Sequence, residues 1–186
     1  FKYSYEFSIY SMIWGWATWK NRWSHFNKGM YNWPDLRETS WLKNIVKNNQ
    51  AESWWKNIFN KSFSEEIDAW SYHLIYSCWE HTALSIVPEV NLVSNIGFGD
   101  SGTHTTFINS YKANMTVNTI NFPLKHPPFI KNNKHLDRFI FEFVISGGSR
   151  SKEEVLRLLK ERDKFQLNPF PTVMRFLKKI GSKLLK

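Results

Sequence analysis

Hydrophobic residues recur most regularly just after Asp68, where their spacing predicts a buried helix. The apolar positions lie three and four residues apart and mark one helix face: Leu74, Ile75, Cys78 and Trp79. Asp68 stands one turn before this run, at a position that suits either a helix N-cap or a general base. Short β-branched runs at 84–87 and 90–93 then predict two strands, the first of them ended by Pro88.

The chain before this helix predicts mainly helical structure. Loose alternation of apolar and polar residues over residues 1–13 indicates an extended strand at the start. Apolar residues repeat at helical spacing in three further segments, at about 18–26, 39–48 and 51–63. Asn49 and Glu52 are a candidate capping pair for the last of these helices. A turn is expected at Trp33–Pro34.

Glycine, proline and serine interrupt the regular pattern after residue 96. Three glycines in six residues favour unusual backbone angles, so residues 97–102 are expected to form a loop. Three prolines exclude a helix interior and predict an extended segment at 119–128. Residues 137–145 suit either a short helix or a short strand, and residues 146–149 have the composition of a linker.

Two helices are expected beyond this linker. A capping box at 151–154 opens the first, which is expected to run to about Lys164. The second, at 172–186, has one apolar face flanked by lysine and arginine. We expect this basic tail to dock on an anionic membrane surface, and the alternative is that it packs on its own domain.

Tryptophan changes the interpretation of the first half of the chain. All ten tryptophans of the 186-residue sequence lie between Trp14 and Trp79. So many large rings need either a thick core, for which the chain is long enough, or a surface that binds rings or sugars. The single cysteine, Cys78, lies on the predicted apolar helix face, so we expect a small buried side chain and no disulfide within the chain.

Positive charge is concentrated in the tail. The formal net charge is +9, but residues 1–149 carry 14 basic and 12 acidic groups, whereas residues 150–186 carry 11 and 4. Because this charge is not interleaved with the aromatic residues, nucleic acid is not an expected partner. No apolar run approaches the roughly 18–20 residues of a membrane span, so a membrane contact is expected to be peripheral.

Several common catalytic motifs are missing from the sequence. It has no phosphate-binding P-loop, no paired-cysteine metal site, no nucleophile elbow and no Asp-x-Asp motif. Asp100 and His104 share the glycine-rich loop and suit a divalent cation, although two ligands make an incomplete site. His73, on the central helix, is expected to be a surface or partly buried histidine.

Five short motifs follow one another between about residues 5 and 130. They are WGWATW at 14–19, DxWxY at 68–72, NLVSNIGFG at 91–99, THT at 103–105 and FPLxHP at 122–127. In this order they resemble the C-terminal part of bacterial family-2-like glycosyltransferases of the GT-A fold. These enzymes are nucleotide-diphospho-sugar transferases of surface-polysaccharide synthesis.

The resemblance implies an α/β fold, mainly helical here, that forms the C-terminal, acceptor-side half of a GT-A-type domain. The Rossmann-like, nucleotide-binding half has no counterpart in the sequence, which starts at Phe1 without an initiator methionine, so we expect a fragment of a longer enzyme. Residues 1–145 would be the acceptor-side portion, and residues 146–186 a linker with a basic helical tail.

The resemblance also implies roles for individual residues. The residues implied to bind the acceptor are Trp14, Trp16, Trp70 and Tyr72. The residues implied to form the donor and metal loop are Gly97, Gly99 and Asp100, with His104 as the metal ligand.

The catalytic candidates are Asp68 and Ser71. In relatives, the residue after the tryptophan of the DxWxY motif is usually an acid, a natural general base for the acceptor hydroxyl. Here that residue is Ser71, which cannot take a proton at neutral pH. Either Asp68, one helical turn earlier, serves as the base, or this copy has lost the step.

The complete enzyme is expected to transfer a sugar from a nucleotide-diphosphate donor to a hydroxyl of a glycan acceptor. A divalent cation, Mn²⁺ or Mg²⁺, would stabilise the departing diphosphate. The expected partners are donor, acceptor and the missing nucleotide-binding half, and the expected location is the cytoplasm, at the inner membrane face. The alternative function is a non-catalytic remnant that binds a glycan or a partner chain.

Overall fold

The structure is a computed structural model that describes residues 2–98, 112–113, 115–146, 154 and 157. The chain divides into two compact units, which are treated separately below. Unit 1 comprises Phe1–Phe7 and Ile86–Lys186, and unit 2 comprises Ser8–Ser85. The described part is mixed and mostly helical, with a small antiparallel sheet of two strands, which fits the expected α/β class. Assignment to half of a GT-A domain stays a prediction.

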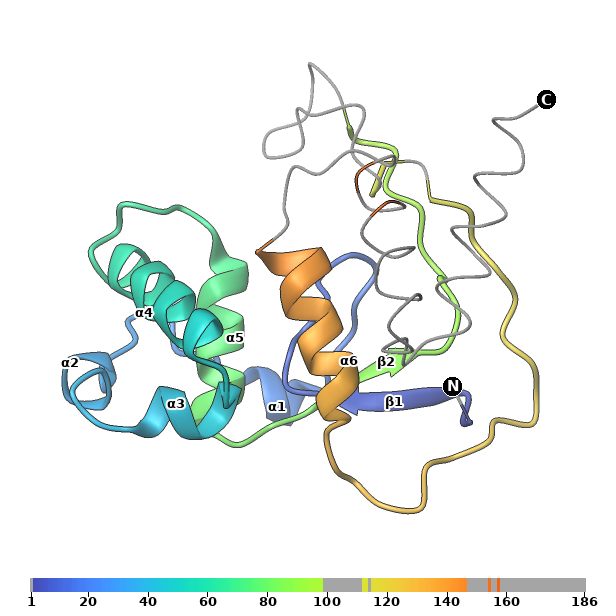
Figure 1. Ribbon diagram of the computed structural model, residues 1–186, viewed down its shortest axis with the longest axis horizontal. Coiled ribbons are helices and arrows are strands. Elements are labelled where there is room, and N and C mark those ends of the chain that lie inside the picture. The colour runs from blue at the N-terminus through green and yellow to red at the C-terminus, as the bar shows by residue number, and fades with distance from the viewer. Residues whose placement is uncertain (1, 99–111, 114, 147–153, 155–156, 158–186) are drawn as a thin grey trace. The chain divides into compact units, whose positions relative to one another are not determined.

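Unit 2 is helical and is built around its two longest helices. Its elements are α1 (Lys20–Trp23), α2 (Trp33–Leu36), α3 (Trp41–Val46), α4 (Asn49–Phe63) and α5 (Trp70–Glu80) (Figure 1). Helix α4 packs against both α3 and α5. The cap of α4 is Asn48, whose side chain accepts a hydrogen bond from the Ala51 N–H at 2.8 Å. The expected cap at Asn49 is therefore wrong by one residue.

Aromatic rings fill the interface between α4 and α5. Trp55 and Phe59 on α4 and Tyr76 and Trp79 on α5 are almost fully buried. The rings meet edge to face, with centroids 4.9 Å apart for Trp55 and Trp79 and 5.5 Å apart for Phe59 and Tyr76. This geometry is the preferred one for aromatic pairs and adds to the free energy gained from burying their surface.

Two of the three polar atoms of these buried rings have partners, whereas the indole N–H of Trp55 has none among the described residues. The indole N–H of Trp79 donates to the Ile9 carbonyl at 2.7 Å, which ties the start of unit 2 to α5. The Tyr76 hydroxyl donates to the carboxylate of Glu80 at 3.3 Å. Burial, together with the charge of Glu80, strongly raises the pKa of Tyr76. Trp79 and Tyr76 thus follow the rule that buried polar groups are hydrogen-bonded, and the Trp55 N–H is an exception to it.

His73 is a buried polar residue of a different kind. It is 8% exposed, and its Nδ1 has no hydrogen-bond partner among the described residues. Burial lowers the pKa of His73, and the charge of Lys28 acts in the same direction. The nearby backbone of Lys28 and the carboxylates of Asp68 and Glu65 oppose this shift without reversing it. The imidazole is therefore neutral in the folded chain at neutral pH.

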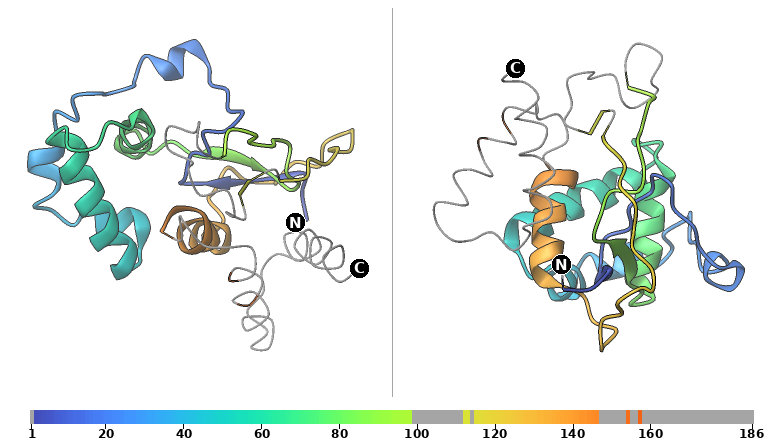
Figure 2. Two further views of the ribbon diagram at one scale, coloured as in Figure 1. Left: turned by 90° about the horizontal axis from the view of Figure 1, so that it is seen from above. Right: turned by 90° about the vertical axis from the view of Figure 1, so that its right-hand side faces the viewer.

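Two strands mark where the chain enters and leaves unit 2. Strand β1 (Tyr5–Ser8) pairs with β2 (Ser85–Pro88), and the two lie side by side (Figure 1 and Figure 2). The Asn133 N–H also donates to the Phe7 carbonyl at 2.8 Å. The strand expected over 1–13 is thus present but short, the one expected at 84–87 is confirmed within a residue, and 90–93 forms no strand.

A short helix follows in unit 1. Helix α6 (Lys134–Phe139) continues directly into η1 (Ile140–Ile145), a wider π-helical segment. Asn133 caps α6 by accepting hydrogen bonds from the N–H groups of His135 and Leu136 at 3.0 and 3.2 Å. The helical alternative for 137–145 is therefore the correct one.

Several predicted elements are shorter in the structure, or lie outside the described residues. The helix expected over 18–26 is reduced to α1, and the turn at Trp33–Pro34 opens helix α2. Cys78 is partly buried, which raises its pKa. Apart from residues 154 and 157, the helices expected beyond residue 150 lie outside the described part, and the boundary at 145/146 stays a prediction. No helix of the described part is long and apolar enough to cross a bilayer.

The packing of aromatic rings between α4 and α5 predicts that two tryptophan substitutions differ strongly in their effect on the free energy of unfolding. Trp55→Ala should lower the free energy of unfolding by about 3–5 kcal/mol, because it removes a fully buried ring and leaves a cavity. Trp19→Ala, at a residue that is 69% exposed, should change it by about 0.5 kcal/mol or less. Urea denaturation followed by circular dichroism measures both. Equal losses would contradict the described core.

The buried imidazole predicts a pH dependence of stability. Below the ordinary histidine pKa of about 6.5, the unfolded chain binds a proton that folded His73 resists. The free energy of unfolding should therefore fall as pH drops below that value, until the folded-state pKa is passed. Urea midpoints measured between about pH 8 and pH 5.5, above the range of most carboxylates, test this. His73→Gln should reduce the slope, whereas His135→Gln, at an exposed histidine, should keep it.

Candidate functional site

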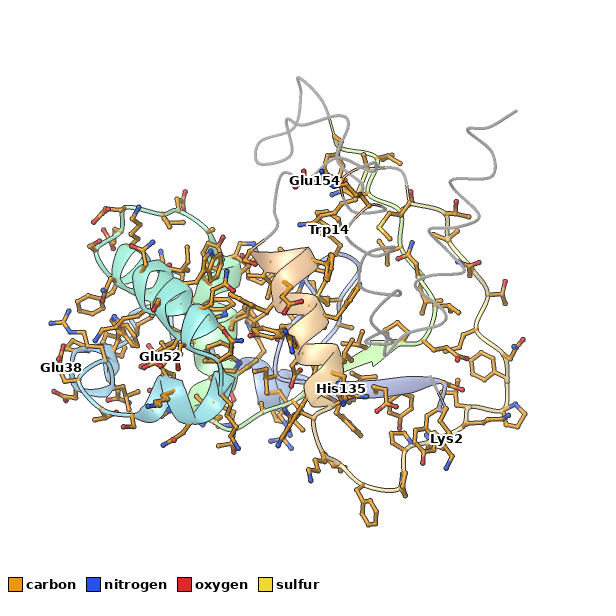
Figure 3. All side chains as sticks on the ribbon, viewed as in Figure 1. Lys2, Trp14, Glu38, Glu52, His135 and Glu154 are labelled. Atoms are coloured by element: carbon orange, nitrogen blue, oxygen red, sulfur yellow. The ribbon has the colours of Figure 1, made fainter. Side chains whose placement is uncertain are left out.

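The ten tryptophans divide into core and surface residues. Trp33, Trp55 and Trp79 are buried in unit 2, as a thick core requires. Half of the ten expose more than a third of their surface: Trp14 (labelled in Figure 3), Trp16, Trp19, Trp23 and Trp70. The core interpretation therefore holds for the buried set, and a surface that binds rings or sugars stays a prediction for the exposed set.

Four aromatic residues of unit 2 form an exposed cluster, which we call the aromatic face: Trp16, Trp23, Phe26 and Trp70. The rings of Trp16 and Trp70 lie 5.5 Å apart at 35°, and those of Trp16 and Trp23 lie 5.8 Å apart at 43°. Trp23 stacks on Phe26 at 4.6 Å. Trp16, Trp23 and Trp70 remain 36%, 42% and 44% exposed, so the cluster is a surface and not part of the core.

Polar contacts hold the segment after Trp23 along α5. The Asn27 N–H donates to the Ser77 hydroxyl at 2.8 Å, and its amide donates to the Glu80 carboxylate at 3.2 Å. The amide of Asn32 donates to the same carboxylate at 2.6 Å. Helix α5 therefore positions both sides of the aromatic face, because Trp70 is its first residue.

Tyr72 belongs to a different side of α5. Residues two apart on a helix point about 200° away from each other, so Tyr72 cannot share the direction of Trp70. Its ring lies 6.4 Å from that of Trp54 and 6.1 Å from that of Trp55, on α4. Burial raises the pKa of its hydroxyl. Of the residues implied to bind the acceptor, the structure brings Trp16 and Trp70 together and turns Tyr72 toward the core.

Asp68 does not cap α5. The N-cap of this helix is Ala69, and no side chain makes a capping hydrogen bond there. The expected capping role is therefore wrong, and the carboxylate is exposed just before the helix. Ser71 lies in the first turn and is partly buried. The role of Asp68 as a general base stays a prediction.

The glycine-rich loop is described only at its beginning. The Gly97 N–H donates to the Asn95 side chain at 2.8 Å, which forms a tight turn. Gly99, Asp100 and His104 lie outside the described residues. Within the described part, no group of three or more His, Cys, Asp or Glu side chains could hold a metal ion. The metal site therefore stays a prediction that rests on Asp100 and His104.

Comparison with known proteins finds no matching family model, no matching curated protein and no matching solved structure. The glycosyltransferase assignment thus rests on the order of the five sequence motifs. The aromatic face is an independent, structural observation, since it depends on contacts between residues about 50 positions apart.

Proposed function

We propose that this chain is the acceptor-side, C-terminal part of a glycosyltransferase, and that the aromatic face of unit 2 binds its glycan acceptor. The observation that carries the proposal is the contact between Trp16 and Trp70, whose rings lie 5.5 Å apart while both stay more than a third exposed. Both residues belong to the motifs on which the resemblance to family-2-like glycosyltransferases rests.

The chemistry of a sugar suits such a face. One face of a pyranose ring presents C–H groups that pack on an indole ring, while its hydroxyls point outward to polar groups. Each indole also carries one N–H donor that can bond a hydroxyl. The 35° angle between Trp16 and Trp70 makes the face bent, so it suits a ring that touches both. Exposed apolar area of this kind marks an interaction site.

Asp68 is the proposed general base. It is exposed, it makes no capping bond, and it precedes Trp70 by two residues. In the complete enzyme, Asp68 takes the proton of the acceptor hydroxyl as that oxygen bonds to the anomeric carbon and the bond to the diphosphate breaks. Ser71 cannot replace it as a base, because a hydroxyl does not accept this proton at neutral pH.

A second candidate function is glycan binding without catalysis. Ser71 favours it, because relatives usually carry an acid at that position. Both functions use the aromatic face, so glycan binding alone does not distinguish them. They differ in whether sugar transfer returns when a nucleotide-binding half is supplied.

Substitutions on the aromatic face should weaken glycan binding. We expect Trp16→Ala and Trp70→Ala each to raise the Kd for an oligosaccharide by about tenfold, or roughly 1.4 kcal/mol, because one stacking surface is lost. A glycan array identifies the oligosaccharide, and isothermal titration measures its Kd. Tyr31→Ala is the matched control, at a ring that is 81% exposed and outside the face. Unchanged binding in both tryptophan variants would remove the basis of the proposal.

The chain alone should not turn over nucleotide-sugars. Incubation with UDP-, GDP- and TDP-sugars and manganese should release no nucleotide above background, because the nucleotide-binding half is not in this sequence. Clear release would refute the assignment to the acceptor side. Addition of a nucleotide-binding half should restore release if the chain is catalytic, and Asp68→Asn should then abolish it. Glycan binding without any restored release would favour the non-catalytic function.

A further inference from the structure

Unit 1 carries a second set of exposed apolar side chains on residues 117–134, which we call the proline-rich segment. Phe122, Phe129 and Ile130 are 78%, 77% and 81% exposed, and thus among the most exposed large apolar side chains of the described part. Residues 117–133 form no helix or strand, and their backbone runs as an irregular chain up to the start of α6 (Figure 1). Apolar side chains this exposed indicate a surface that another body covers.

The charge of this segment has one sign. Lys125, Lys131 and Lys134 are exposed beside the apolar residues, and the sequence has no Asp or Glu between residues 101 and 136. The next acid, Asp137, is buried and accepts a hydrogen bond from the Asn132 amide at 2.6 Å. His135 adds an exposed imidazole at the start of α6 (Figure 3). The partner that fits this surface is therefore anionic.

Hydrogen bonds hold the backbone of the segment while its apolar side chains stay outside. The Ser4 N–H donates to the Lys125 carbonyl at 2.9 Å, and the Lys125 N–H donates to the Ser4 hydroxyl at 2.9 Å. The Tyr5 hydroxyl and His126 Nδ1 are hydrogen-bonded at 3.0 Å. At the other end, the Asn118 N–H donates to the Asn91 carbonyl at 2.8 Å. Docking therefore needs little further ordering of the chain.

We propose that the proline-rich segment docks unit 1 on an anionic lipid bilayer. Phe122, Phe129 and Ile130 enter the interfacial layer, and the three lysines meet lipid phosphates. Prolines favour this placement, since they have no N–H group that would lose its water partner near the acyl chains. Residues 119–128 contain three of them.

The same features argue against a protein partner. The buried centre of a protein interface is depleted in lysine, because its charge must be desolvated there. In a bilayer interface, by contrast, a lysine can bury its alkyl stem and keep its ammonium group among the headgroups. Here lysines alternate with the apolar residues along the sequence, at positions 125, 131 and 134. In the sequence, this segment does not overlap the basic tail at 172–186.

Sedimentation with sucrose-loaded vesicles tests the proposal on the full chain. We expect binding to vesicles of phosphatidylcholine and phosphatidylglycerol that weakens with added salt, and much weaker binding to phosphatidylcholine alone. A triple substitution to Gln at Lys125, Lys131 and Lys134 should weaken it about a hundredfold, or about fivefold per lysine. A triple substitution to Ser at Phe122, Phe129 and Ile130 should weaken it by at least about tenfold.

Matched variants in unit 2 control for net charge and for general hydrophobicity. A triple substitution to Gln at the exposed Lys43, Lys47 and Lys61 removes the same amount of positive charge. The substitution Tyr31→Ser removes a ring that is 81% exposed. Both should lower vesicle binding far less than the two test variants. Circular dichroism confirms that each variant folds.

The contribution of the basic tail is separated by repeating the experiment with a chain that ends at residue 171. The segment variants should weaken binding in this background as well. Hydrogen exchange provides a second readout, in which peptides that cover 117–131 should exchange more slowly on anionic vesicles. The proposal is overturned if both triple variants bind like the parent chain in both backgrounds. It is equally overturned if the segment mediates self-association in solution without any vesicle binding.

Discussion

The contact of Trp79 with Trp55 and Phe59 is the interaction on which unit 2 depends. This contact fixes α5 against α4, with the Trp79 ring centroid 4.9 Å from that of Trp55 and 5.6 Å from that of Phe59. The indole N–H of Trp79 also donates a hydrogen bond to the Ile9 carbonyl. One side chain thus joins two helices and the first residues of the unit. Because the rings are rigid and closely packed, they leave α5 little freedom to rotate about its own axis.

This fixed orientation decides which aromatic residues face solvent. With Tyr76 and Trp79 directed at α4, the helical period turns Tyr72 toward Trp54 and Trp55 and leaves Trp70 outside. Glu80, at the other end of α5, receives hydrogen bonds from the amides of Asn27 and Asn32. Core packing and surface presentation are therefore two results of the same helix position.

Hydrophobic spacing is sufficient to predict α4 and α5, because their apolar residues face one densely packed side. Strand β2 is predicted instead by its β-branched run, since Ile86 within it is 52% exposed. Hydrophobic spacing is insufficient for capping, since Asn48 and Asn49 are chemically equal and only backbone geometry selects between them. Proline at the first turn of α2 looked like a turn because a helix start tolerates it equally well. The resemblance names Trp16 and Trp70 together as acceptor-binding residues, but hydrophobic spacing does not predict that their rings form one exposed face. Indole is apolar enough for a core and polar enough for a surface, and the contact between Trp16 and Trp70 depends on folding.

The two ends of unit 2 meet, because the hydroxyls of Ser11 and Ser85 are hydrogen-bonded at 2.9 Å. Because the ends of unit 2 already lie together, a change in its length has little effect on the entropic cost of closing the chain. Each doubling of the length between two such ends costs only about 0.6 kcal/mol. Such a segment behaves as an insertion between two paired strands. Evolution can lengthen, trim or exchange it while the register of β1 and β2 stays the same. Unit 2 is thus the part of the chain whose helices and surface residues can change without redesign of the sheet.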